Sequence, residues 1–294
     1  MSSKRPAVKP GTRKAAGKGA RVRVARPTGF CFGVQRAIDL ARAGKEKFGQ
    51  VSTLGELVHN PLVLEELEAQ GIKAVSRVSG VRGGALVIRA HGCPPATVEE
   101  CRRRGIRTID ATCPYVRKVQ SVARRLREGG YAVVVVGERN HPEVRSILGH
   151  CAPAGRVYTP GMRPKSRKIG VVAQTTMSRE GLRAAVANLS RLRYTELRVF
   201  DTICREVTAR QQAAARIAGL SDIVIVVGGR NSANTSRLAE IVRGAGRQVV
   251  FVERAEELKP AMLKRHRRIG VIAGSSTPSS VVEKIVAIVR NPVP

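Results

Sequence analysis

The chain has 294 residues, 43% of them hydrophobic, which is enough to bury a core in one to three domains. Its formal net charge of +31 implies attraction to anions such as phosphorylated substrates, acidic redox proteins or nucleic acid. The longest apolar runs are far too short to cross a bilayer, and the basic N-terminus lacks the apolar stretch of a secretory signal. We therefore expect a cytoplasmic protein without membrane contact.

Much of the charge lies in a few basic segments. Residues 1–20 combine Lys and Arg with Pro, Gly and Ala, which predicts a disordered basic tail. Basic runs at residues 102–104 and 264–268 are interpreted most simply as solvated helix surfaces. Aromatic residues make up 3% of the chain and Trp is absent, so platforms for stacking single-stranded nucleic acid are scarce. We expect nucleic acid to bind only non-specifically.

After the tail, short apolar runs recur, and nearly every one ends in a cluster of small or polar residues. Short β-branched runs between turn formers are typical of buried parallel strands. The expected buried strands cover residues 86–90, 133–136, 169–173, 223–227 and 269–273. Residues 51–55 and the runs that lead into Cys31, Cys113 and Cys204 are also expected to be extended.

Helical patterns separate these strands. Apolar residues recur at i, i+3, i+4 and i+7 over residues 34–41 and again over residues 119–126. Pro114 suits the first position of a helix. Alternating strands and helices imply parallel sheets, whose ligands bind beyond the carboxyl ends of the strands. The polar clusters of this chain lie at such ends.

Three cysteines, Cys31, Cys113 and Cys204, each stand where an extended run gives way to a helical pattern. Their similar spacing indicates three repeats of one α/β unit, with one thiol in each. A thiol at a helix start feels the positive end of the helix dipole, which predicts easier ionisation, and the thiolate is the metal ligand. Three converging thiolates would suit an iron–sulfur cluster with one iron left uncapped.

The other cysteines are less informative. Cysteines in an intracellular chain favour metal or redox chemistry over disulfides, and the absence of Cys-x-x-Cys argues against a zinc ribbon or a thioredoxin-type site. Cys101 lies in a basic helix and Cys151 in a Pro/Gly loop, so both are interpreted as incidental. Cys93 also follows a strand, and spacing alone does not rank it below the three.

Three histidines and one glutamate stand at strand ends. His59 follows an extended run, and His91 and His141 directly follow buried strands. His91 and His141 are interpreted as phosphate or substrate contacts, whereas His150 is interpreted as structural. Glu143 is the best candidate for a general acid, because desolvation and nearby charges would shift its pKa. The alternative is a capping glutamate in the first turn of the next helix.

Hydroxyl and amide groups recur in the second and third units, in clusters predicted at helix starts. Such groups can hold a diphosphate without a P-loop, although helix capping alone would also explain them. No Gly-x-Gly-x-x-Gly motif and no Walker lysine occurs. The clusters are Thr175-Thr176, Ser232-Ala233-Asn234 and Ser275-Ser276.

Several motifs occur together in this chain. They are Gly29-Phe30-Cys31-Phe32-Gly33-Val34, Val58-His59-Asn60, Ala90-His91-Gly92, Asp110-Ala111-Thr112-Cys113-Pro114, His141-Pro142-Glu143-Val144, Gln174-Thr175-Thr176, Asp201-Thr202-Ile203-Cys204 and Ala273-Gly274-Ser275-Ser276-Thr277-Pro278. On these motifs, residues 22–289 resemble the 4-hydroxy-3-methylbut-2-enyl diphosphate reductases, the LytB/IspH family of isoprenoid synthesis.

The resemblance implies an α/β fold in which three similar small domains with parallel sheets form a pseudo-threefold trefoil around a central cavity. The expected domains are residues 33–112, 113–200 and 201–290, and the strand within residues 21–32 would join the third. The resemblance also implies a [4Fe–4S] cluster held by Cys31, Cys113 and Cys204.

The activity implied by the resemblance is the reductive removal of a hydroxyl group as water, which yields isopentenyl and dimethylallyl diphosphate. Glu143 would deliver the proton, with Thr175 and His141 in its network. The groups that would hold the diphosphate are His59, His91, Ser232, Asn234 and Ser276. An acidic ferredoxin or flavodoxin would supply electrons through the basic surface.

The chain departs from the family pattern at several positions, among them Val207, where the family usually has Thr, and Ala233, where it usually has Ser. A lost hydrogen bond to a charged group costs about 1.5–3 kcal/mol, so the missing serine hydroxyl could weaken diphosphate binding. Two alternatives to the reductase stay open. One is a diverged paralogue acting on another allylic diphosphate, and the other is a nucleic-acid-binding protein.

Overall fold

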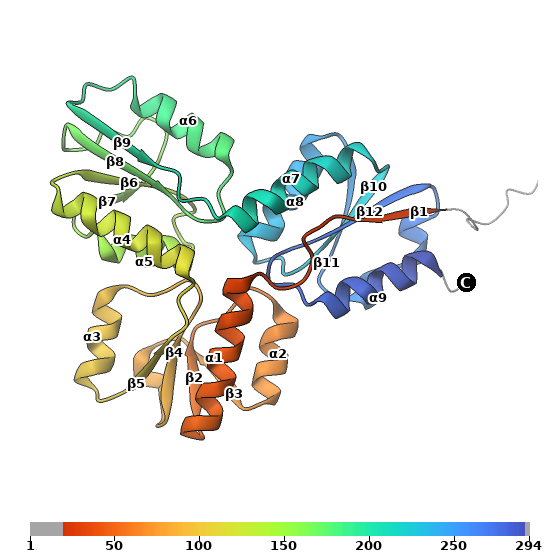
Figure 1. Ribbon diagram of the computed structural model, residues 1–294, viewed down its shortest axis with the longest axis horizontal. Coiled ribbons are helices and arrows are strands. Elements are labelled where there is room, and N and C mark those ends of the chain that lie inside the picture. The colour runs from red at the N-terminus through yellow and green to blue at the C-terminus, as the bar shows by residue number, and fades with distance from the viewer. Residues whose placement is uncertain (1–19, 292–294) are drawn as a thin grey trace, which may run out of the picture.

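The computed structural model describes residues 20–291, so nearly all of the predicted basic tail lies outside the described residues. Three lobes surround a common centre, and the helices α1, α4 and α7 each begin close to that centre (Figure 1). Each lobe contains a four-stranded sheet in which every strand pairing is parallel. The α/β class and the trefoil arrangement expected from the sequence are therefore confirmed.

The first lobe is formed around a sheet with the strand order β3-β2-β4-β5. Its strands are β2 (Val51–Leu54), β3 (Ile72–Val75), β4 (Ala85–Ile88) and β5 (Arg107–Asp110). Its helices are α1 (Phe32–Phe48), α2 (Pro61–Ala69) and α3 (Pro95–Arg103), with a short 3₁₀ turn, η1 (Val78–Gly80).

The second lobe repeats this topology, with the order β7-β6-β8-β9. Its strands are β6 (Ala132–Val136), β7 (Gly155–Val157), β8 (Lys168–Ala173) and β9 (Glu196–Phe200). Its helices are α4 (Pro114–Glu128), α5 (Pro142–His150) and α6 (Arg179–Leu189).

The third lobe has the order β11-β10-β12-β1, so the first strand of the chain fills the place taken by β5 and β9 in the other lobes. Val22 of β1 pairs with Ile269 of β12 in a parallel register. The strands are β1 (Arg21–Val24), β10 (Ile223–Val227), β11 (Gln248–Val252) and β12 (Arg268–Ala273). The helices are α7 (Arg205–Gly219), α8 (Ala233–Gly244) and α9 (Ser279–Arg290), with the 3₁₀ turns η2 (Ala255–Glu257) and η3 (Pro260–Leu263).

The cores explain why these residues form these elements. On α1, the predicted apolar face packs against Val51 and Val87 of the first sheet, and on α4 it packs against Val133 and Val135 of the second. Each fully buried aliphatic side chain stabilises the fold by about 1.5–3 kcal/mol. The short edge strands β3 and β7 are less apolar, and the periodicity did not predict them.

Pro114 is the first residue of α4, as predicted, because a helix needs no N–H donor at that position. Within the described part of the chain, none of the helices is long and apolar enough to cross a membrane.

Candidate functional site

The three predicted ligand thiols occupy equivalent positions in the three lobes. Each cysteine follows an edge strand, β1, β5 or β9, and is the N-cap of a helix, α1, α4 or α7. In each case the cysteine N–H donates to a carbonyl two residues beyond the neighbouring strand. These bonds run from Cys31 to Ser275 (2.9 Å), from Cys113 to Ala90 (2.9 Å) and from Cys204 to Thr175 (3.0 Å).

The thiols also lie close to one another at the junction of the lobes. A Cβ atom added to Gly33, two residues after Cys31, would meet the Sγ atom of Cys113 at 2.6 Å. Burial raises the pKa of Cys113 and of Cys204, and the charge of neighbouring cysteine thiolates raises both further. The structure therefore brings Cys31, Cys113 and Cys204 together, from positions far apart in the sequence.

The expectation that these thiols ionise easily is wrong for Cys113 and Cys204 in the protein alone. First-turn N–H groups do donate to each sulfur, those of Tyr115 and Val116 to Cys113, and these bonds lower the pKa. Burial outweighs them, so the net pKa is raised. A cationic metal core would reverse this balance, because a coordinated thiol is deprotonated by the ion. Three clustered thiols with N–H donors around them therefore fit an iron–sulfur group.

The remaining cysteines are separate from this set. Cys93 is buried, and its pKa is raised to about 12 by burial and by the charges of Asp110 and Cys101. Cys101 lies in a small apolar cluster of the first lobe. The Sγ of Cys151 donates to the carbonyl of Ile147 at 3.3 Å inside the second lobe. The structure thus distinguishes Cys93 from the three clustered thiols, which spacing alone did not.

Three imidazoles form a second cluster. The ring centroids of His59 and His91 are 4.4 Å apart, and His141 lies 5.4 Å and 5.3 Å from them. One ring nitrogen from each lies within 4.8 Å of the others, close enough to share a metal ion or an anion. Burial lowers the pKa of His91 and brings that of His141 to about 3, and both are lowered further by neighbouring imidazoles and by Arg89. His91 and His141 are therefore neutral near pH 7.

The position of His59 depends on the third lobe. Its Nδ1 lies 2.7 Å from Oε2 of Glu56, which also accepts from the side chain of Asn231 at 2.9 Å. The hydroxyl of Ser276 donates to the backbone carbonyl of His59 at 3.0 Å. His59 Nε2 and His91 Nδ1 are buried and have no hydrogen-bond partner among the described residues. Such orphaned atoms indicate a site built for a polar ligand.

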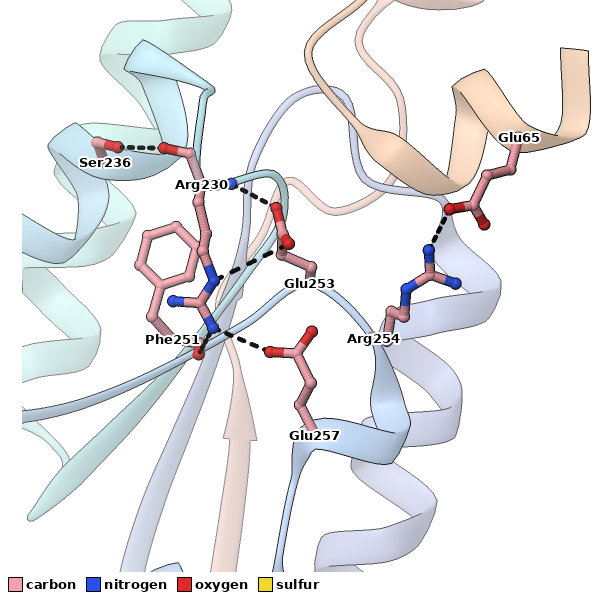
Figure 2. Close-up of polar contacts among 7 residues, drawn as sticks. All are labelled: Glu65, Arg230, Ser236, Phe251, Glu253, Arg254 and Glu257. Carbon is pink, nitrogen blue, oxygen red and sulfur yellow. Dashed lines mark hydrogen bonds and ion pairs between the residues drawn. The ribbon is translucent and has the colours of Figure 1, made fainter. Parts of the chain in front are cut away.

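An arginine network fixes the loop after β10, which carries Asn231 (Figure 2). The backbone N–H of Arg230 donates to Glu253 at 2.7 Å, and its guanidinium donates to Glu257 at 3.0 Å. The same guanidinium lies over the ring of Phe251, 5.3 Å from the ring centroid. Beside it, an ion pair between Arg254 and Glu65 joins the third lobe to the first.

Glu143 is near both a thiol and an imidazole of these clusters. Its side chain is 1% exposed, and the N–H and hydroxyl of Thr175 donate to its two oxygens at 2.7 Å and 2.8 Å. Burial raises the pKa of Glu143 to about 7, although the bonds from Thr175 oppose the shift. Its N–H donates to Nδ1 of His141 at 3.1 Å, and its charge raises the pKa of Cys113. Glu143 does lie in the first turn of α5, but its carboxyl group binds Thr175 across the lobe.

The hydroxyl and amide clusters have mixed positions. Ser232 caps α8, as predicted, and the nearby Asn234 is buried with its Oδ1 unpartnered among the described residues. The Thr175 and Ser275 clusters are not at helix starts, which corrects the sequence prediction. The helices α6 and α9 begin only at Arg179 and Ser279, because further turn residues follow β8 and β12. These clusters instead occupy turns at the strand ends.

Sequence reasoning missed several charged residues of this region. Glu56 orients His59, and Arg89 lies half-buried beside the imidazoles. Arg210 is fully buried on α7. One signal in the sequence points to Arg210: it occupies an apolar face of its helix, in phase with Val207 and Ala214.

The fold and the site define a trilobed α/β protein that brings one thiol per lobe, three imidazoles and a buried carboxyl group to its centre. The model of the LytB protein family matches residues 22–290, and the chain therefore belongs to that family. The resemblance inferred from the motifs is confirmed.

Curated relatives support this assignment. The chain is 41% identical over 271 residues to a protein of Geotalea uraniireducens named 4-hydroxy-3-methylbut-2-enyl diphosphate reductase, covering 90% of this chain and 95% of the relative. It is 38% identical over 270 residues to the protein of that name from Aquifex aeolicus, covering 89% of this chain and 93% of the relative.

Two solved structures share the fold. One is described as (E)-4-hydroxy-3-methyl-but-2-enyl diphosphate reductase, with 36% identity, a TM-score of 0.68, and coverage of 91% of this chain and 98% of that chain. The other is the E-1-hydroxy-2-methyl-but-2-enyl-4-diphosphate reductase from Plasmodium falciparum, with 27% identity, a TM-score of 0.88, and coverage of 94% and 89%.

Proposed function

We propose that this protein is an iron–sulfur oxidoreductase that removes the hydroxyl group of 4-hydroxy-3-methylbut-2-enyl diphosphate, the last step of the methylerythritol phosphate route to isoprenoids. The overall reaction consumes two electrons and two protons and releases water together with isopentenyl or dimethylallyl diphosphate. One observation carries the proposal: the buried Glu143 is near both clusters, because its charge raises the pKa of Cys113 and its backbone N–H donates to Nδ1 of His141. The relatives named as this reductase support it.

Cys31, Cys113 and Cys204 would hold a [4Fe–4S] cluster. Three features of these cysteines fit such a group. They make equivalent backbone hydrogen bonds, their thiols cluster, and N–H groups donate to the sulfurs of Cys113 and Cys204. When bound, the cluster would supply electrons and, at the iron without a thiolate, a Lewis acid.

Glu143 would deliver a proton to the reacting part of the substrate. A carboxyl group with a pKa of about 7 is partly protonated at neutral pH, which is the condition for a general acid. Thr175 holds both carboxyl oxygens and so fixes the direction of transfer. His141 accepts the N–H of Glu143 at Nδ1, so a neutral ring carries its own proton on Nε2 and can donate from that atom.

The diphosphate would bind the second cluster and the loops of the third lobe. His59 and His91 each have an unpartnered buried nitrogen, and Arg89 adds positive charge beside them. Donors from the third lobe would complete the cradle, and they are Ser232, Asn234 and Ser276.

The electron donor would be an acidic protein such as a ferredoxin or a flavodoxin. The net charge of +31 favours such a partner, and Phe32 and Arg205, directly after Cys31 and Cys204, are exposed close to the thiols. Electron transfer from this donor is expected to slow with salt, whereas reduction by a small chemical reductant is not. Salt-insensitive transfer from the protein donor would contradict this part of the proposal.

A second candidate is a paralogue that reduces another allylic diphosphate. Val207 and Ala233 favour it, because both replace hydroxyl residues of the family pattern at the site. At Val207 the side-chain hydroxyl is missing, but the backbone N–H still donates to the sulfur of Cys204.

The test is an anaerobic assay of cluster-loaded protein with 4-hydroxy-3-methylbut-2-enyl diphosphate and a low-potential reductant, with both products quantified. Turnover by the wild type and its loss in an equally loaded Glu143→Gln variant are expected. A fully loaded wild type without turnover would overturn the assignment to this substrate. Turnover of a different allylic diphosphate in that sample would establish the second candidate.

A further inference from the structure

Arg210 is the largest side chain that the fold buries completely, with 1% of its surface exposed. It lies on α7, six residues after the capping Cys204. Its guanidinium donates to three backbone carbonyls, of Pro27 at 2.9 Å, Gly29 at 2.9 Å and Ala273 at 3.2 Å. Arg210 therefore joins α7 to the segment that leads into Cys31 and to the end of β12.

The charge of Arg210 is not neutralised by an ion pair. Within residues 20–291, no salt bridge includes Arg210, and its Nε atom is buried without a partner. Burial lowers its pKa, and the groups whose negative charge opposes this shift are Cys31, Glu206 and Cys204. Burying a guanidinium costs several kcal/mol, so a compensating negative charge is expected near it. Of these three groups, Cys204 is buried and Cys31 and Glu206 are partly buried, and Cys31 and Cys204 are the two that belong to the thiol cluster.

The repeat shows that packing alone does not require an arginine here. The other cysteine-capped helices have Ala37 and Val119 at the same distance from their capping residues. Both side chains are fully buried in apolar clusters. A buried aliphatic residue thus suffices at this position in two lobes out of three, and the third lobe has a cation.

We propose that Arg210 is the fixed counter-charge of the iron–sulfur cluster, which stabilises its reduced state while holding the segment from Pro27 to Cys31 in place. This inference rests on the proposed function, because it assumes that the three thiols hold the cluster. A cluster bound by three thiolates carries net negative charge, and each electron accepted adds to it. A buried cation nearby therefore favours reduction, since net charge near a cluster is one determinant of its potential.

The experiment measures the midpoint potential of the loaded protein by redox titration followed by electron paramagnetic resonance. Arg210→Gln and Arg210→Met remove the charge, Arg210→Lys keeps it, and Arg216→Gln removes a charge from an exposed position of the same helix. In the neutral variants, we expect the ratio of reduced to oxidised cluster at a fixed potential to fall about tenfold. For one electron this is a shift of about 59 mV to lower potential. Arg210→Lys is expected to stay near the wild type, and Arg216→Gln is expected to match it.

Each outcome decides the proposal. Iron and sulfide content shows which variants bind the cluster. If Arg210→Lys binds it and neither neutral variant does, the result would also support the proposal that the site requires a positive charge. A neutral variant that binds the cluster and keeps the wild-type potential would overturn the proposal. Failure of all three Arg210 variants to bind the cluster would also overturn it, because it would indicate that Arg210 has a purely structural role. A wild type that binds no iron would instead overturn the proposed function itself.

Discussion

The thiol cluster and the proposed diphosphate cradle are built from the same repeat in opposite ways. At the thiols, the three lobes supply the same residue with the same backbone bond from cysteine N–H to a strand-end carbonyl. At the cradle, the equivalent positions differ. Five residues after the equivalent strands β2, β6 and β10 stand His59, His141 and Ser232.

The difference separates two tasks. A metal cluster needs several equivalent ligands, and a pseudo-threefold fold supplies them by repetition. An asymmetric substrate needs a different group at each of its ends, so the lobes diverge where they face it. The same holds directly beside the thiols, where the carbonyls that accept from cysteine belong to Ala90, Thr175 and Ser275. Of these three residues, only Thr175 has a side chain that binds a buried carboxyl group.

The largest expected effect follows from breaking the repeated set. Cys113→Ser removes one of the three proposed ligands, and we expect the protein to bind no iron–sulfur cluster and turnover to become undetectable. Iron and sulfide content after anaerobic reconstitution measures this. Cys93→Ser is the matched control, because Cys93 is also a buried cysteine near a strand end but interacts with Cys101 and Asp110. Equal iron loss in both variants would contradict the distinction drawn between these cysteines.

Replacing Glu143, which has no equivalent among the three repeated thiols, should leave the cluster intact and remove proton delivery. Glu143→Gln is expected to lower kcat by about 10²–10⁴, the usual contribution of a general acid. The wild-type rate should also fall as the pH rises through about 7, because the protonated form donates and Glu143 ionises there. Steady-state rates between pH 6 and pH 9 test this. An unchanged alkaline limb in the glutamine variant would assign that limb to another group.

Glu143 also links stability to pH. Its folded pKa lies above the ordinary value, so the stability it contributes is present below its unfolded pKa and is lost as the pH rises through about 7. The free energy of unfolding of Glu143→Gln, compared with that of the wild type, should therefore increase as the pH rises from 5 to 8. Denaturant unfolding at both ends of this range measures the gain, and a constant difference would contradict the raised pKa.

Ala233 allows a test of the departures from the family pattern. Ala233→Ser adds a hydroxyl group at the first position of α8, beside Ser232 and Asn234. A hydrogen bond to a charged group contributes about 1.5–3 kcal/mol, which corresponds to roughly tenfold to a hundredfold in affinity. We expect KM to fall with kcat unchanged. Val207→Thr is the control, because Val207 lies at Cys204, and it should leave KM unaltered.

The sequence predicted local features better than the contacts between lobes. The buried runs of β6, β10 and β12 predicted parallel strands, and Pro114 marked the start of a helix. The contact of Glu56 with His59 could not be predicted, because it depends on Asn231 from another lobe. The raised pKa of Cys113 could not be predicted either, since local helix geometry lowers it and only tertiary burial raises it.

The smallest expected effect concerns the protonation of the cradle. His91 and His141 are neutral in the free protein because burial lowers their pKa, and a bound diphosphate anion would raise it again. The bound protein then holds more protons than the free protein, so affinity should rise as the pH falls, by at most about tenfold per pH unit for each proton. Calorimetry of the loaded protein with inorganic diphosphate, in buffers of different ionisation enthalpy, counts the protons taken up. His91→Gln should reduce that number, whereas Ser276→Ala should weaken binding without changing it. Binding that releases protons, or takes up none, would show that the imidazoles stay neutral beside the anion.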